Sequence, residues 1–196
     1  MVEHTPWIGP DYGRSDTSLG GQRVAIVGYS HWLEDRWEDT NEATIDCISK
    51  VMSGELRIPF FTQVRNYFGH DTHKGFWQQV MFFNYLANCV GGGDERFNSG
   101  TSEQVNIAES RFLCLIEEHR PDKVLIFTAR SKDFPPVENR LQSIQGFPKF
   151  KWGTYSGRNH RASTFFLRHP QGANGELMRS AVKYILGLPN VKSDPN

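Results

Sequence analysis

A histidine and an asparagine have the types and settings in this sequence that best suit chemistry. His169 follows the apolar run Thr164–Leu167, and a ring beyond a strand can donate a hydrogen bond to a developing anion or carry a proton. Asn84 stands inside an apolar run, where its donor and acceptor suit the edge of a nucleobase. The structural alternatives are a surface histidine and an amide that anchors backbone, and both stay open here.

A second candidate lies in the loop that follows Gly28. The apolar run Val24–Val27 is too short for a helix and is bounded by turn residues, which predicts a strand buried on both faces. Ligands in open α/β sheets bind beyond the carboxyl ends of the strands, so Tyr29, Ser30 and His31 are candidate site residues. Ser30 and His31 offer a nucleophile and a base. The second glycine of a nucleophile elbow is missing, which makes a serine hydrolase the weaker alternative.

Metal and phosphate motifs are weak in this chain. His70, Asp71 and His73 are potential ligands at close spacing, but they lack a fourth ligand, so we expect a solvated turn. Gly91–Gly93 is not followed by the Gly-Lys-Ser/Thr of a phosphate loop. We therefore expect no metal and no organic cofactor.

The three cysteines, Cys47, Cys89 and Cys114, are an odd number and are widely spaced among apolar neighbours. We expect reduced core thiols, since neither a disulfide framework nor a zinc motif fits this spacing.

Length and composition predict one domain, 1–196, with an irregular lead-in at 1–22 and a tail at 188–196. The chain has 196 residues, of which 38% are hydrophobic and 22% charged, as in globular proteins. It has neither an apolar stretch of ~20 residues nor a secretory signal pattern, so we expect a cytoplasmic protein without a membrane partner.

Charge is unevenly distributed although the formal net charge is zero. Residues 1–60 hold ten acids and five bases, whereas residues 140–192 hold nine bases and only Glu176 as an acid. This basic segment is either a solvated face or a surface for a polyanion such as DNA.

The pattern of elements predicts an α/β fold, a three-layer α/β/α sandwich around a mostly parallel, four-stranded sheet. Helices are expected over Glu34–Ser53 (capped by Asp39, Thr40 or Asn41), from about Lys74, from Thr101 after a capping box with Gln104, and over Glu176–Leu186. Strands are expected at Val24–Val27, Val124–Thr128 and Thr164–Leu167, and Val80–Phe83 is either helix or strand. Loops around short elements are expected over 131–162.

The order of these pieces resembles the uracil-DNA glycosylase superfamily. Gly28–Trp32 stands at the place of the first motif, Pro59–Thr62 resembles the base-stacking segment, Phe83–Tyr85 the asparagine motif, and His169–Ala173 the late histidine motif. The resemblance covers about residues 22–187. It implies hydrolysis of the N-glycosidic bond of uracil, or of another deaminated base, after the nucleotide is flipped out of single- or double-stranded DNA. A monomer that binds DNA is expected.

The resemblance also implies a role for each matching residue. Catalysis is assigned to His169, with Ser30 or Asp35 holding water; base binding to Asn84, Phe61, Phe60, Tyr29 and His31; and DNA binding to Arg161, Arg168, Gln171, Gly172, Asn174 and Arg158. The chain departs from the family in three ways: Tyr29 and Ser30 replace the usual first-motif acid, the iron–sulfur cysteines are absent, and the late motif lacks its leucine wedge. A non-catalytic nucleic-acid-binding module of the same fold is therefore the alternative.

Overall fold

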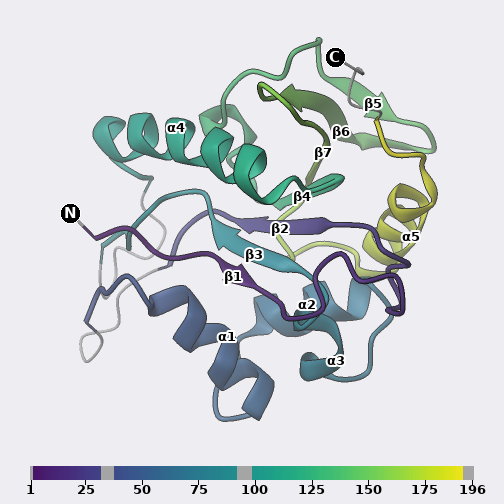
Figure 1. Ribbon diagram of the computed structural model, residues 1–196. Coiled ribbons are helices and arrows are strands. Elements are labelled where there is room, and N and C mark those ends of the chain that lie inside the picture. The colour runs from purple at the N-terminus through teal and green to yellow at the C-terminus, as the bar shows by residue number, and fades with distance from the viewer. Residues whose placement is uncertain (1, 32–37, 92–98, 192–196) are drawn as a thin grey trace.

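The computed structural model describes residues 2–31, 38–91 and 99–191, which form one mixed sheet with helices on both faces (Figure 1). The strands are β1 (Trp7–Ile8), β2 (Val24–Gly28), β3 (Met81–Asn84), β4 (Lys123–Phe127), β5 (Gln142–Ile144), β6 (Phe147–Ser156) and β7 (Arg161–Leu167). The helices are α1 (Ala43–Ser53), α2 (Pro59–Tyr67), α3 (His73–Trp77), α4 (Ser102–His119) and α5 (Gly175–Gly187), with a 3-10 turn at Ser131–Asp133.

The sheet has the strand order β1-β3-β2-β4-β7-β6-β5. The pairs β3–β2, β2–β4 and β4–β7 are parallel, whereas β1, β6 and β5 join in antiparallel orientation. The predicted α/β class is confirmed. The prediction of a mostly parallel, four-stranded sheet is wrong, because in the described residues the sheet has seven strands and three of its six strand pairs are antiparallel. The extra strands lie in the predicted lead-in and in 131–162, where exposed lysines and a glycine obscure the alternation of β6.

Alternation along the parallel strands divides the core into two clusters, one on each face. Val24 and Ile26 of β2 belong to a cluster with α1, α2, α3 and α5, whereas Ala25 and Val27 belong to a cluster with α4. Figure 1 shows the same division, with α4 on one side of the sheet and α1, α2 and α3 on the other. We call the first of these faces the α2 face and the second the α4 face.

The helix predictions differ in how well they succeed. The capping box is confirmed, since Thr101 Oγ1 accepts from Gln104 N at 3.1 Å and Gln104 Oε1 accepts from Thr101 N at 2.9 Å. Helix α1 begins only at Ala43, its N-cap Glu42 makes no side-chain cap bond, and 34–37 of its predicted range lie outside the described residues. Helix α2, which begins at Pro59, was not predicted.

The prediction of three core thiols is wrong for one cysteine. All three are free, but Cys47 is buried, Cys89 is half-buried and Cys114 is exposed on α4. None of the helices in the described ranges combines the length and the apolarity needed to cross a membrane.

Candidate functional site

The carboxyl ends of four parallel strands place the main candidate residues along one edge of the sheet. Asn84 ends β3 and pairs in register with Gly28, which ends β2. His169 follows the end of β7, and β4 lies between β2 and β7. Because side chains alternate along a strand, Asn84 lies on the α2 face with Phe82. Phe60 packs against this face too, which makes the α2 face at this edge the candidate site.

The Asn84 side chain is almost enclosed, with 5% of the residue exposed. A Cβ at Gly28 would overlap Asn84 Oδ1, so the absence of a side chain at Gly28 makes room for the carboxamide. The backbone carbonyl of Asn84 accepts from Arg111 Nη1 at 3.0 Å, but within the described part of the chain the carboxamide has no hydrogen-bond partner. It therefore does not anchor backbone, and its donor and acceptor are available to a ligand.

The two phenylalanines of α2 have different environments. The Phe60 ring is half-buried and lies 5.6 Å from the His169 ring and 6.0 Å from the Phe82 ring, centroid to centroid. Phe61 is 3% exposed and packs between Trp77 and Phe82 in the core. Of the two predicted stacking residues, Phe60 is thus the one that faces the site.

The environment of His169 favours one neutral tautomer. Its Nδ1 accepts from Gln171 N at 3.2 Å, so in the neutral ring the proton is on Nε2, which is then a donor. Burial lowers the pKa of the half-buried imidazole, which favours the neutral form. Gly172, with φ +78°, makes the turn that follows, and Asn174 Oδ1 accepts from Leu177 N at 2.9 Å as the cap of α5.

Tyr29 and His31 are bound elsewhere, so their prediction as base-binding residues is not supported. The Tyr29 hydroxyl donates to Asp133 Oδ2 at 2.7 Å, and its ring packs against the α4 face. His31 Nε2 lies 3.0 Å from Thr44 Oγ1, and burial lowers the pKa of its imidazole to about 3. The Tyr29 ring thus lies on the opposite face of the sheet from Phe60, and the His31 ring lies beside α1.

The predicted water-binding residues are placed only in part. Ser30 is half-buried directly after β2, and among the described residues its hydroxyl has no hydrogen-bond partner. The predicted alternative, Asp35, lies outside the described residues.

The predicted DNA-binding arginines are split between the two ends of β7. Arg168 is exposed beside His169, and so is Gln171. Arg161 begins β7, about 20 Å away along a strand of seven residues, and pairs with Glu138 at 2.7 Å. Arg158 precedes Arg161, so neither arginine lies beside His169. The net charge of residues 140–192 could not predict the positions of these arginines, because it does not indicate at which end of a strand a residue lies.

One cationic residue near the end of β7 lies on the other face of the sheet. Lys151 of β6 pairs with Phe166, whose side chain belongs to the α4 face, and its Nζ donates to Ser143 Oγ at 2.8 Å. It therefore does not face the candidate site.

The dense ligand pattern around residue 70 is explained by local hydrogen bonds. His70 Nε2 lies 3.0 Å from Ser18 Oγ, and His73 Nε2 lies 3.3 Å from Thr62 Oγ1. Both rings are half-buried and serve the packing between the N-terminal loop, α2 and α3.

Comparison with known proteins adds no family to this geometry. No protein-family model matches the chain, and no curated protein sequence matches it.

Proposed function

We propose that this chain is a DNA glycosylase that hydrolyses the N-glycosidic bond of uracil or another deaminated base. The observation that carries the proposal is the position of Phe60. Its ring contacts both the His169 ring and the ring of Phe82, which lies two residues before Asn84 on the same face of β3. An imidazole, an aromatic face and an unpaired carboxamide therefore follow one another along a single edge.

Each of these groups has a role that its geometry suits. The flipped base would stack on Phe60, and the Asn84 carboxamide would bond to its edge. When the glycosidic bond breaks, its electron pair goes to the base, and His169 Nε2–H donates to the anionic base oxygen, in the manner of an oxyanion hole. A water molecule beside Ser30 then adds to the sugar cation and loses a proton, which the anionic base takes up as it leaves.

Flipping a nucleotide out of a duplex costs roughly a few kcal/mol. Contacts to the phosphates must offset this cost. Arg168 and Gln171 are exposed near the carboxyl end of β7 and offer a cation and an amide for this purpose. These two residues replace Arg158 and Arg161 in the proposed DNA contact.

The test is an incubation of the chain with single- and double-stranded oligonucleotides that contain uracil, hypoxanthine or xanthine, followed by alkali to cleave abasic sites. We expect cleavage with at least one base. Asn84→Asp, which replaces the amide donor, should lower the rate by at least about tenfold. The matched control is Asn106→Asp on the exposed side of α4, which should keep the rate. Absence of abasic product from every oligonucleotide would refute the proposal.

A non-catalytic nucleic-acid-binding module is the second candidate. The observation that favours it is the first-motif loop, where the Tyr29 hydroxyl is bound to Asp133 and Ser30 stands at the place of an acid. This candidate predicts DNA binding that weakens with salt and yields no abasic product. The serine hydrolase has no such support, because His31 is bonded to Thr44 and has no contact with Ser30 among the described hydrogen bonds.

A further inference from the structure

Three potential metal ligands of different chemistry meet at the edge of the sheet that β1 forms. A ring nitrogen of His4, a carboxylate oxygen of Asp39 and Cys89 Sγ all lie within 4.8 Å of one another. We infer that these three residues form a binding site for a divalent cation of the zinc type. The sequence predicted no metal here, since the three residues are far apart in the chain and follow no ligand spacing.

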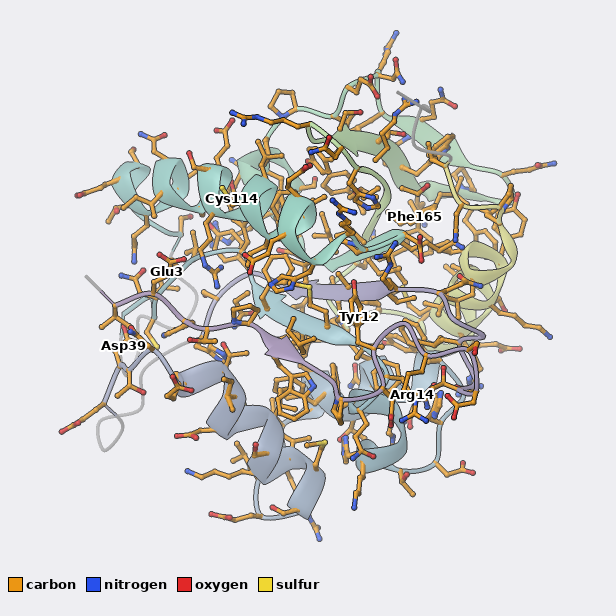
Figure 2. The ribbon with its side chains drawn as sticks, in the orientation of Figure 1. Glu3, Tyr12, Arg14, Asp39, Cys114 and Phe165 are labelled. Atoms are coloured by element: carbon orange, nitrogen blue, oxygen red, sulfur yellow. The ribbon has the colours of Figure 1, made fainter. Side chains whose placement is uncertain are left out.

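Backbone hydrogen bonds hold the three segments together. His4 N donates to Ala87 O at 2.7 Å, so the N-terminal segment is tied to the loop that follows β3. Cys89 N donates to Asp39 Oδ2 at 3.2 Å, which fixes the orientation of the carboxylate. Figure 2 shows Asp39 on the same side of the molecule as Glu3, the neighbour of His4. These hydrogen bonds thus hold the ligands in position, as at known metal sites.

The donor set suits zinc. Nitrogen, oxygen and thiolate sulfur bind Zn²⁺ at about 2.0 to 2.3 Å, so three such atoms need to move little from their present separation to surround one ion. His4 Nε2 and Asp39 Oδ1, now 2.6 Å apart, share a proton that the ion would displace together with the thiol proton. A thiolate and a carboxylate would balance the two charges of the cation, and water would take the fourth position.

The burial of His4 supports the same inference. The residue is 1% exposed, so its ring is held in place with Nε2 directed at Asp39 Oδ1, where the ion would bind. The side chain of Asp39 is 25% exposed, which gives an ion access from solvent.

The site would clamp the segment before β1 to the loop after β3, the strand that ends with Asn84. Its existence does not depend on the proposed glycosylase activity, so metal binding and base excision can be tested separately.

The test is a titration of the metal-free full chain with Co²⁺, which replaces zinc and has visible absorption. We expect one equivalent to produce a thiolate-to-cobalt charge-transfer band in the near ultraviolet and the visible bands of a tetrahedral ion. Zn²⁺ should abolish both. A titration that produces neither band would overturn the inference and leave a hydrogen-bonded cluster only.

Two variants and a control locate the ion. Cys89→Ser should remove the charge-transfer band. It should also weaken Zn²⁺ binding by at least about 10- to 100-fold, since loss of a hydrogen-bond partner of a ligand alone costs that much. Asp39→Asn should weaken binding but keep the band, because the thiolate remains. Cys114→Ser, at an exposed cysteine of α4, should change neither.

Thermal unfolding distinguishes loss of the site from loss of the fold. Zn²⁺ should raise the Tm of the native chain and of Cys114→Ser but not that of Cys89→Ser, since only a cation that binds the folded state stabilises it. A charge-transfer band that persists in Cys89→Ser would place the ion elsewhere and contradict the inference.

Discussion

Polar side chains at the two ends of the parallel strands differ in whether they have hydrogen-bond partners. At the amino end, Lys123 is fully buried, and its ammonium donates to Gln22 Oε1 at 2.7 Å and Asn190 Oδ1 at 2.8 Å. Asp122 Oδ2 accepts from Arg23 N at 2.7 Å. Each of these buried or half-buried polar groups has a protein partner, as expected where they serve stability alone.

At the carboxyl end the corresponding partners are missing in the described part of the chain. The Asn84 carboxamide and the Ser30 hydroxyl have none, and His169 is bonded through Nδ1 only. The donors and acceptors of these groups are available to a ligand, which is the physical reason for assigning ligand binding to this end. The contrast also says what substitutions should do at each end.

The largest expected effect is on catalysis at the carboxyl end. His169→Ala removes the donor to the departing base and should lower uracil release from an oligonucleotide by roughly 100- to 1,000-fold. The free energy of unfolding should change by less than about 1 kcal/mol, because the ring is only half-buried. Abasic product and urea denaturation measure the two. The control is His119→Ala on α4, and an unchanged rate in His169→Ala would remove this residue from the mechanism.

The opposite outcome is expected at the amino end. Lys123→Met keeps the aliphatic stem but leaves Gln22 Oε1 and Asn190 Oδ1 without their donor. We expect the free energy of unfolding to fall by about 1–3 kcal/mol, with the rate per folded molecule unchanged. Urea denaturation and the same oligonucleotide assay test this. A lower rate at unchanged stability would break the distinction between the two ends.

Local patterns explain which parts of this fold could be predicted. The capping box at Thr101 involves only four consecutive residues, and the strand at Val24–Val27 is a single apolar run. Both can therefore be predicted from the sequence. The pairing of β6 with β7 depends on contacts between segments that are separate in the sequence. Strand β6 is half-exposed and carries lysines, so its composition did not indicate a strand. Helix α2 was missed because a run of aromatic residues obscures its buried positions, Phe61, Val64 and Tyr67.

Individual site residues could be predicted only where the end of a strand determines the position of the side chain. Asn84 and His169 follow apolar runs, and the parallel sheet brings those ends to one edge. Tyr29 stands one residue past Gly28, and alternation turns its side chain to the α4 face. The cluster of His4, Asp39 and Cys89 depends on loop contacts over many residues, which no spacing rule contains.

A smaller effect should follow from adding one methyl group at the carboxyl end. In Gly28→Ala the new Cβ overlaps Asn84 Oδ1, so the carboxamide must turn away from its present position. Because misplacing a binding group lowers catalysis, we expect about tenfold less base excision. Gly187→Ala is the matched control, since a Cβ there meets open space. Equal rates for the two variants would show that the position of the carboxamide does not matter.

The smallest expected effect is a pH dependence that belongs to His169. Burial lowers the pKa of this ring below the ordinary 6.5, so the acidic limb of the rate profile should lie below pH 6.5, about where free histidine titrates. Protonation of Nδ1 would also break its bond from Gln171 N, which needs an acceptor. Rates measured between about pH 7 and 5 test the limb.

The same ring should make stability depend on pH. The unfolded chain binds the proton more readily than the folded one, so this contribution is fully present above about pH 6.5 and is lost as the pH falls toward the folded pKa. The slope from this ring should stay below about 1.4 kcal/mol per pH unit, because one imidazole takes up at most one proton. His169→Gln should remove this part of the slope in urea denaturation, while Lys123→Met should keep it. An unchanged slope in His169→Gln would mean that another group titrates. The pH dependence of stability could then not be assigned to the carboxyl end of the strands.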